Sequence, residues 1–268
     1  MSYKIISFEE RMKAVKPVSM AIFGKSGVGK TSLLKTVSHK ALLVDLEAGD
    51  LVLSDWKGGK FAVREYPMMR DLAAMIGGVN PVAKKGELFS KEHFEKAKEN
   101  FGMGREELLG EYETIFIDSI TVLSRLCLAW AEVQPELKAG DMRGAYGLLA
   151  RDMMRMLSHI QHNPDKNIIF VGILDELQDD FNRVYYQPQM EGGKVAREIS
   201  GILDLVLTMD NLKYVDKDNK ETIKKVFYTN QMNEFGYPAK DRSGKLAPIE
   251  KADLSRVFSK IKNEVKSD

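Results

Sequence analysis

The chain has 268 residues, which is long enough for one large α/β domain or for two small ones. Its 40 basic and 39 acidic side chains give a net charge of +1, so no global basic field indicates tight, non-specific binding to DNA. The single cysteine, Cys127, excludes a disulfide within the chain and favours a reducing compartment. No apolar run is long enough to span a bilayer and the N-terminus lacks a signal-type core, so we expect a cytoplasmic protein without membrane contact.

No break in composition demands two domains, and we predict one domain over residues 1–268. Residues 1–17 are predicted to form a short strand or arm that leads into the core. Apolar runs bounded by turn residues predict buried strands over residues 18–23, 41–46, 60–66 (stopped by Pro67), 114–118, 167–174, 203–209 and 225–230. Apolar residues at helical spacing predict helices over residues 30–39, 68–76, 120–133, 141–162 and 254–261.

Three further segments are predicted to be less regular. Residues 77–110, rich in Gly, Lys and Glu, form a surface excursion with a helix over residues 90–100. Residues 175–200 have no clean period and form a long loop, and residues 216–219 are the polar tip of a hairpin. Strands that alternate with helices and end in an antiparallel pair predict an α/β fold. Its central sheet would be mostly parallel and flanked by helices on both faces, with ligand at the carboxyl ends of the strands.

The stretch Gly24–Thr31 reads GKSGVGKT and fits the phosphate-loop pattern G-x-x-x-x-G-K-[ST] at every fixed position. A predicted strand precedes it and a predicted helix follows, so that glycines can turn the backbone and helical amides can face an anion. Lys30 is expected to reach the β- and γ-phosphates of ATP, and the Thr31 hydroxyl to ligate Mg²⁺. The predicted nucleotide-binding residues are Gly24, Lys25, Ser26, Gly27, Val28, Gly29, Lys30, Thr31 and Ser32.

Two carboxylates follow predicted strands downstream of this loop. Asp118 ends one strand, at the position from which phosphate-loop enzymes hold Mg²⁺ directly or through water. Asp118 or Ser119 also suits the N-cap of the next helix, and the two roles can coexist. Ser119 is expected to hydrogen-bond to Thr31 or to a water. Glu47 follows another strand and is the candidate base for the attacking water, although its position fits a solvated turn carboxylate equally well.

Three cations have two interpretations each. Lys25 suits a solvated loop lysine, or a lysine that reaches across a dimer as in the deviant phosphate loops of the MinD/ParA partition ATPases. Ser26 stands where that family's K-G-G-x-G-K-T loop has glycine. Lys240 and Arg242, in a charged turn, are either solvated or offered to the γ-phosphate of a neighbouring subunit, as arginine fingers are.

Residues 175–200 are also the candidate DNA-binding loop, since aromatic rings stack on bases and cations meet phosphates. Acidic residues in the same segment would repel DNA, and a packed or mobile loop fits the segment as well. The residues expected to contact DNA are Arg183, Tyr185, Tyr186, Lys194 and Arg197, with Phe181 as a further stacking ring.

Together these motifs resemble the RecA/RadA class of ATPases, and within it the phage AAA-type nucleotide-binding proteins that include single-strand annealing ATPases of the Sak group. The matching stretches cover roughly residues 20–254 and read GKSGVGKTSLLKT, LLVDLEAG, TIFIDSITVLSRL, QPQMEGGKVAREISGILDLVL and AKDRSGKL. The phosphate loop alone is unspecific among ATPases, whereas the order of D-x-E, D-S-[IV] and a late K-x-R-x-G is more specific. The strand over residues 167–174 departs from the class, because it ends in GIL where RecA relatives carry a polar sensor.

The resemblance implies a Mg²⁺-dependent, RecA-like ATPase that acts on single-stranded DNA in recombination or annealing. It implies that Glu47 is the catalytic glutamate, that Lys240 and Arg242 act in trans, and that residues 175–200 occupy the place of the second DNA-binding loop. It also implies a homo-oligomeric ring or filament with ATP between neighbours, the cytoplasm of a bacterial host, and a single-strand-binding protein as a further partner. The alternatives are an ATP-dependent assembly module with little turnover and a MinD/ParA-like partition switch.

Overall fold

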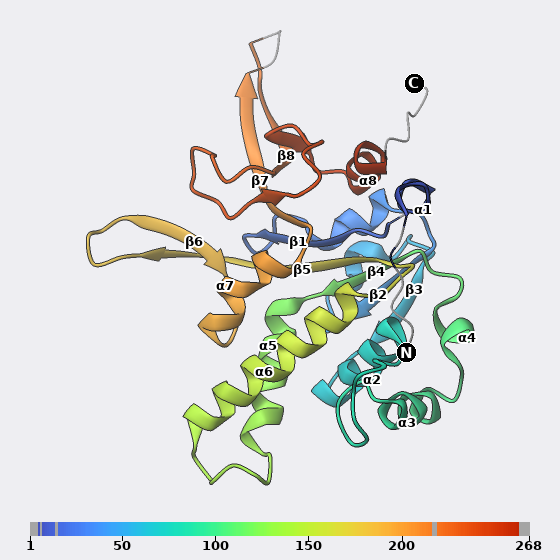
Figure 1. Ribbon diagram of the computed structural model, residues 1–268. Helices are drawn as coiled ribbons and strands as arrows, with labels where there is room; N and C mark the ends of the chain where they lie inside the picture. Colours follow the sequence, from blue (N-terminus) through green and yellow to red (C-terminus); the bar gives the residue numbers. More distant parts are fainter. Residues whose placement is uncertain (1–4, 6, 14–15, 216–218, 263–268) are drawn as a thin grey trace.

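The structure, a computed structural model, describes residues 5, 7–13, 16–215 and 219–262. Within that part of the chain, ten strands form one connected sheet in the order β10-β8-β7-β1-β5-β4-β2-β3, with β6 beside β5 and β9 beside β7 (Figure 1). The strands with parallel partners are β1 (Ser19–Gly24), β2 (Ala41–Asp45), β3 (Gly59–Ala62), β4 (Thr114–Asp118), β5 (Asn167–Gln178) and β7 (Leu205–Val215). The strands with antiparallel partners alone are β6 (Val184–Pro188), β8 (Glu221–Tyr228), β9 (Lys240–Asp241) and β10 (Ile249–Lys251). The predicted α/β fold, with a mostly parallel sheet and a late antiparallel pair, is confirmed.

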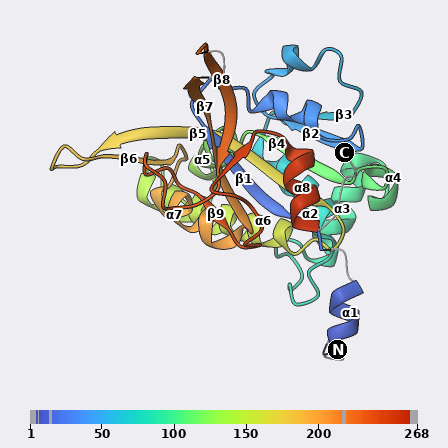
Figure 2. The same ribbon diagram turned by 90° about the horizontal axis from the view of Figure 1, so that it is seen from above.

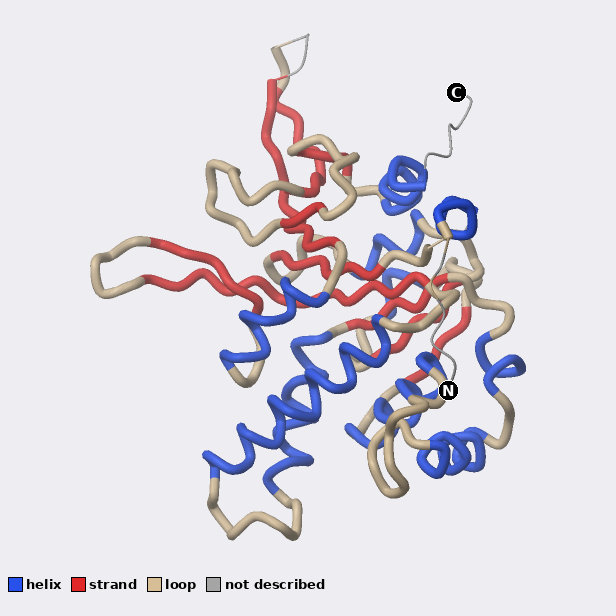
Figure 3. Tube along the Cα trace, in the orientation of Figure 1, coloured by secondary structure: helices blue, strands red, loops and turns tan. Residues whose placement is uncertain are grey.

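Helices cover both faces of this sheet (Figure 3). One face carries α2 (Tyr66–Gly77), α5 (Ile120–Glu132), α6 (Met142–Gln161) and α7 (Gly193–Ile202). The other face carries the 3₁₀ helices η1 (Thr31–Thr36) and η2 (Asp50–Leu53) together with α8 (Leu254–Lys262). The remaining described helices are α1 (Phe8–Lys13), which lies apart from the sheet in Figure 2, and α3 (Lys91–Phe101) and α4 (Arg105–Leu109), which contact α2. None of the described helices is both long and apolar enough to cross a membrane.

Parallel pairing brings the carboxyl ends of several strands to one edge of the sheet. β1 lies between β5 and β7, with Met20 beside Ile169 and Leu205. β2 lies between β3 and β4, with Asp45 opposite Asp118. The loops that follow β1, β2 and β4 therefore start from the same edge, where ligands of open α/β sheets bind.

Several element boundaries differ from the predictions. Residues 8–13 form a helix within the predicted N-terminal arm. The helix after the phosphate loop is a 3₁₀ helix over Thr31–Thr36, shorter than the predicted residues 30–39. β3 ends at Ala62, short of the predicted residue 66, because α2 begins at Tyr66 with Pro67 in its first turn. Proline fits there, since the first amides of a helix need no carbonyl partner.

The prediction of a long loop over residues 175–200 is wrong. β5 continues past Leu174 and forms a hairpin with β6, and α7 follows from Gly193. Beyond Leu174 the β5 side chains alternate between half-buried and exposed positions, so acidic residues on a two-faced strand had concealed its period. A helical spacing of buried apolar residues identifies α7, and these residues are Val195, Ala196 and Ile199.

The last pair of long strands also extends beyond the predictions of residues 203–209 and 225–230. β7 runs to Val215 and β8 begins at Glu221. Of the predicted polar tip over residues 216–219, residues 216–218 lie outside the described residues. Figure 1 shows the β5–β6 and β7–β8 hairpins leaving the body as two separate arms.

Candidate functional site

The phosphate loop follows β1, and steric constraints explain why glycine occupies three of its positions. Gly27 and Gly29 have φ values of 77° and 103°, in the left-handed region that favours glycine. A Cβ atom on Gly24 would lie 2.6 Å from the carbonyl oxygen of Met209 on β7, so a larger residue there would collide with backbone. Val28 packs into the core on the η1 face, which fixes the loop to that side of the sheet.

Lys30 lies inside this turn. Its ammonium donates hydrogen bonds to the carbonyl oxygens of Gly24, at 2.9 Å, and of Lys25, at 3.1 Å. Burial lowers the pKa of Lys30, and the nearby carboxylates of Asp118 and Glu47 oppose that shift. The structure thus places a partly buried cation where the sequence predicted contact with phosphates.

Thr31 and Asp118 form a pair at the predicted metal position. The Thr31 hydroxyl donates to Asp118 Oδ2 at 2.6 Å. Burial raises the pKa of Asp118 to about 6, against the opposing effect of the Thr31 hydrogen bond. No group of three or more His, Cys, Asp or Glu side chains suited to a metal occurs among the described residues. A hydroxyl and a carboxylate are nevertheless the hard oxygen donors that Mg²⁺ takes from proteins, one or two at a time beside phosphate and water, so this pair fits Mg²⁺.

Glu47 stands on the turn after β2, facing the start of α5. The Ser119 hydroxyl donates a hydrogen bond to Glu47 Oε1 and accepts one from the Val122 amide, so Ser119 caps α5 as well. The expected partner of Ser119 was Thr31 or a water; the hydroxyl is bonded to Glu47, and Thr31 is bonded to Asp118. The predicted cap is present at Ser119, and the metal role of Asp118 stays a prediction.

Asp45, the aspartate of the D-x-E motif, was given no role of its own from sequence, and it holds this turn. Its Oδ1 atom accepts hydrogen bonds from the amides of Glu47, at 3.1 Å, and Ala48, at 2.7 Å. Its other oxygen, Oδ2, lies 2.9 Å from the ammonium of Lys60 on β3. The only sequence signal was the carboxylate two residues before Glu47, which is a spacing that suits an Asx turn.

Comparison with known families identifies the class of protein to which these residues belong. A family model described as an AAA domain matches residues 16–243. The chain belongs to this AAA domain family. The match extends from just before β1 to the turn after β9, and it places the protein among the AAA-type phosphate-loop ATPases.

Solved structures give weaker likenesses to this AAA domain. A prototypical ATPase from the type III secretion system of pathogenic bacteria is 16% identical with a TM-score of 0.38, over 73% of this chain and 52% of that one. The Legionella pneumophila ATPase DotB is 9% identical with a TM-score of 0.30, over 95% of this chain and 55% of that one. This chain therefore spans about half the length of both proteins, and TM-scores this low say nothing of its activity. No curated protein matches the chain.

Lys25 links the phosphate loop of the AAA domain to the β5–β6 hairpin. Its ammonium lies 3.0 Å from Glu176 Oε2 on β5, and this hydrogen bond raises the pKa of Lys25. The Tyr186 hydroxyl donates to the same carboxylate oxygen at 3.2 Å. Within its own chain Lys25 is therefore an ion-paired residue, and its proposed reach across a dimer stays a prediction.

Lys240 and Arg242 lie at the end of α7 in the AAA domain. The Lys240 ammonium donates to the carbonyl oxygens of Ser200, at 2.6 Å, and Leu203, at 2.9 Å. The Arg242 guanidinium donates to Asp204 Oδ1 at 3.1 Å and to the Gly201 carbonyl at 2.9 Å. Both cations thus hold the C-terminal end of one helix, where positive charge is favourable. A role toward a neighbouring subunit stays a prediction.

The residues predicted to contact DNA are divided between two elements. Arg183 and Tyr185 lie on the β5–β6 hairpin, where the Arg183 guanidinium pairs with Asp179 at 2.8 Å. Tyr186 is half-buried at the base of that hairpin, against the ring of Tyr237 at 4.7 Å. Lys194 and Arg197 are exposed on α7 instead.

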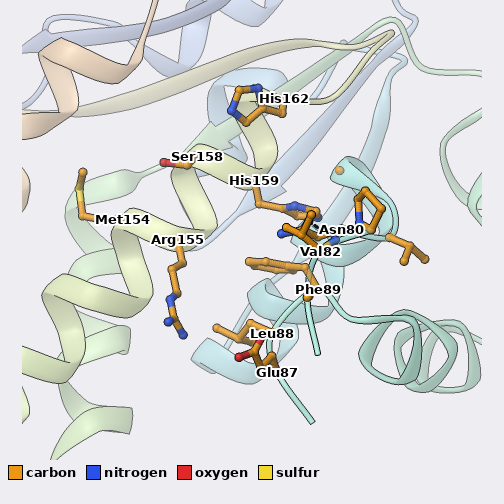
Figure 4. A pocket seen from close by; sticks show the side chains of 14 residues that line it. Asn80, Val82, Glu87, Leu88, Phe89, Met154, Arg155, Ser158, His159 and His162 are labelled. Atoms are coloured by element: carbon orange, nitrogen blue, oxygen red, sulfur yellow. Dashed lines mark hydrogen bonds between the residues drawn. The ribbon is translucent and has the colours of Figure 1, made fainter. Parts of the chain in front are cut away.

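A large cavity of about 770 Å³ lies elsewhere, between the end of α6 and residues 77–89 (Figure 4). The rings of Phe89 and His159 stack there with centroids 3.9 Å apart and planes 7° apart. His159 Nε2 lies 3.0 Å from the carbonyl oxygen of Gly78. None of the predicted nucleotide-binding residues lines this cavity, so its size does not mark the chemical site.

Proposed function

We propose that the protein is a Mg²⁺-dependent ATPase whose hydrolysis site lies where β1, β2 and β4 end. The observation that carries this proposal is the meeting of Lys30, the Thr31–Asp118 pair and Glu47, which come from three separate loops. Phosphoryl transfer uses these same parts, namely a cation on the phosphates, a metal position and a carboxylate that orients water.

Each side chain has one task in the proposed reaction. The loop amides and the Lys30 ammonium bind the triphosphate and balance the charge that grows as the bond to the terminal phosphate breaks. Thr31 and Asp118 would hold Mg²⁺, which when bound supplies further charge stabilisation. Glu47 accepts the proton of the attacking water, and the Ser119 hydroxyl fixes the direction of its carboxylate.

Substitution of Glu47 separates binding from turnover. In Glu47→Gln we expect ATP to bind as in the wild type while phosphate release falls by roughly 100-fold or more, because general-base catalysis is lost. Phosphate release in single-turnover experiments and ATP affinity are measured side by side. Glu113→Gln, which removes an exposed carboxylate paired with Lys40, is the control and should leave both unchanged. Unchanged phosphate release in Glu47→Gln would remove the base assignment.

We propose further that nucleotide turnover changes the affinity of the β5–β6 hairpin for single-stranded DNA in recombination or annealing. The hairpin leaves the body in Figure 2, and its Phe181 and Tyr185 side chains are 78% and 44% exposed. The Arg183 guanidinium lies 5.2 Å from the centroid of the Phe181 ring. Exposed rings beside a cation are the groups on which unstacked bases are bound.

The DNA proposal is tested with the double variant Phe181→Ala/Tyr185→Ala. We expect its affinity for a single-stranded oligonucleotide to fall by roughly tenfold for each ring, since stacking on one ring contributes about 1–3 kcal/mol. Tyr214→Ala on the other hairpin is the matched control. Wild-type affinity should fall with salt at a slope of about −0.7 per phosphate contact. Failure of the wild type to retain the oligonucleotide at low salt with ATP would end this proposal.

A further inference from the structure

Lys225 lies on β8, almost 200 residues from the phosphate loop in sequence, yet its side chain reaches Gly29 of that loop. A Cβ atom built on Gly29 would lie 2.3 Å from Lys225 Nζ, 3.5 Å from its Cε and 3.8 Å from its Cδ. Gly29 immediately precedes Lys30. The structure therefore brings a second ammonium group to the turn that holds the first.

The strand pairing fixes this position. Phe227, two residues along β8, is buried in the same core as Val28 of the phosphate loop. Because alternate residues of a strand share a face, Lys225 faces the loop as Phe227 does. Across the hairpin, Phe227 pairs with Met209, whose carbonyl oxygen abuts Gly24. β8 thus extends past the level at which β1 ends and places the Lys225 ammonium beside Gly29.

The Lys225 ammonium differs from the other cations at this site in what it contacts. Lys30 donates to two carbonyl oxygens and Lys25 pairs with Glu176. The Lys225 side chain is exposed and, within the described part of the chain, its ammonium makes no hydrogen bond, ion pair or ring contact. Its neighbour Lys224 faces the opposite side of β8 and lies over the Tyr214 ring at 4.1 Å.

We propose that Lys225 is a second cation for the nucleotide, supplied by the same chain and directed at the α- and β-phosphates. This inference rests on the proposed nucleotide-binding function and adds a residue to it. The amides of a phosphate loop cradle the α- and β-phosphates, and Gly29 is part of that cradle. An ammonium beside Gly29 therefore lies where a charge-assisted hydrogen bond to a phosphate oxygen can form.

The test compares Lys225→Met with Lys224→Met in the otherwise complete chain. Titration with fluorescent ADP and ATP should show Lys225→Met binding both nucleotides roughly tenfold more weakly, as expected for loss of one hydrogen bond to a charged group. Lys224→Met should bind as the wild type does, and Lys225→Arg should restore most of the affinity. The difference should shrink at high salt, since Lys225 is exposed. Thermal unfolding without nucleotide should be unchanged in all three variants.

Three results would overturn the inference. Equal affinities in Lys225→Met and Lys224→Met would show that Lys225 does not contact the nucleotide. A loss for ATP but not for ADP would contradict its placement at the α- and β-phosphates. A loss seen only at protein concentrations where copies associate would contradict its action within one chain. If instead the wild type binds neither nucleotide, the proposed function itself fails, and this inference fails with it.

Discussion

Asp45 and Asp118 lie opposite each other on neighbouring strands, but their carboxylates have different hydrogen-bond partners. Asp118 accepts the Thr31 hydroxyl and faces the phosphate loop. Asp45 turns away to accept two amides of the next turn and to pair with Lys60. Asp45 is therefore a positioning residue, because it fixes the backbone that carries Glu47, the proposed catalytic carboxylate.

Substitution of Asp45 should affect turnover more than binding. In Asp45→Ala the amides of Glu47 and Ala48 lose their acceptor, so we expect phosphate release to fall by about tenfold or more while ADP affinity stays within about twofold of the wild type. Both are measured on the same preparations. Lys60→Met removes the ion pair but keeps the acceptor, and it should retain most of the turnover. Equal losses of turnover in Asp45→Ala and Lys60→Met would contradict the positioning role.

His159 predicts a pH dependence of stability. Burial lowers its pKa from 6.5 to about 4, against the opposing hydrogen bond to Gly78 and with the neighbouring His93 and His162 adding to the shift. Between these pH values the unfolded chain binds a proton that the folded chain does not. Above about pH 6.5 His159 is neutral in both states and costs no stability. As the pH drops from 6.5 toward 4, protonation of the unfolded chain lowers the free energy of unfolding, by about 1–2 kcal/mol after allowance for solvent screening.

Urea unfolding across this pH range checks the prediction. The variant His159→Gln loses the stack on Phe89 and should be less stable than the wild type at neutral pH. Its stability should, however, depend less steeply on pH, because His93 and His162 are present in both proteins and only the His159 contribution is removed. Identical slopes in the two proteins would show that His159 titrates normally in the folded chain.

Residues that depend on a local pattern were predictable, and residues that depend on strand register were not. The phosphate loop, Glu47 and Asp118 each follow an apolar run, and parallel runs end at one edge of a sheet. Lys225 reaches the loop only because β8 extends beyond the end of β1, and strand ends are poorly fixed by sequence pattern. The hydrogen bond from Ser119 to Glu47 was missed for a related reason, because it depends on how the turn after β2 lies beside the start of α5.

At the scale of elements, the β5–β6 hairpin connects the phosphate loop to the proposed DNA surface. Lys25 pairs with Glu176, which also accepts the Tyr186 hydroxyl, and Tyr186 packs on Tyr237. β5 carries Gly172, Ile173 and Leu174 where RecA relatives have a polar sensor, and within the described residues these contacts link the phosphate loop to the hairpin. Sequence pattern missed the element because its acidic residues concealed a strand.

Breaking this link should weaken the influence of nucleotide on DNA affinity. In Lys25→Met and in Glu176→Gln we expect the ratio of single-stranded DNA affinities with and without ATP to fall toward one. The change should be modest, within about fivefold, because an exposed ion pair contributes about 0.2–1 kcal/mol. Lys98→Met, which removes an exposed ion pair with Glu95 on α3, is the control. A ratio unchanged in both link variants would exclude this route.

At the scale of the whole molecule, the proposed ring or filament places Lys240 and Arg242 against the nucleotide of a neighbour. Lys240 donates to two carbonyl oxygens of its own chain, so its removal should destabilise the end of α7. A loss of activity in such a variant could then not be separated from a loss of stability. Arg242 makes an exposed pair with Asp204 and one hydrogen bond to the Gly201 carbonyl, so its loss should cost less stability than the loss of Lys240. Arg242 is therefore the better probe of action in trans.

Mixing two inactive variants tests that arrangement. Glu47→Gln keeps Arg242, and Arg242→Ala keeps Glu47, so an equal mixture should recover about a quarter of wild-type ATPase activity if each site takes the two residues from different copies. Each variant alone should be nearly inactive. A mixture no more active than its components would show that Arg242 does not act between copies, whatever the assembly.

Lys30 has three N–H groups, and two of them are directed at carbonyl oxygens of its own loop. An incoming phosphate must take the third or displace Gly24 or Lys25 from the same nitrogen. Nucleotide binding is then an exchange of oxygen atoms around one nitrogen rather than a simple addition. Gly24 abuts β7 and Lys25 pairs with Glu176 on β5, so the two carbonyl oxygens that phosphate would displace belong to residues that contact the strands of the two hairpins.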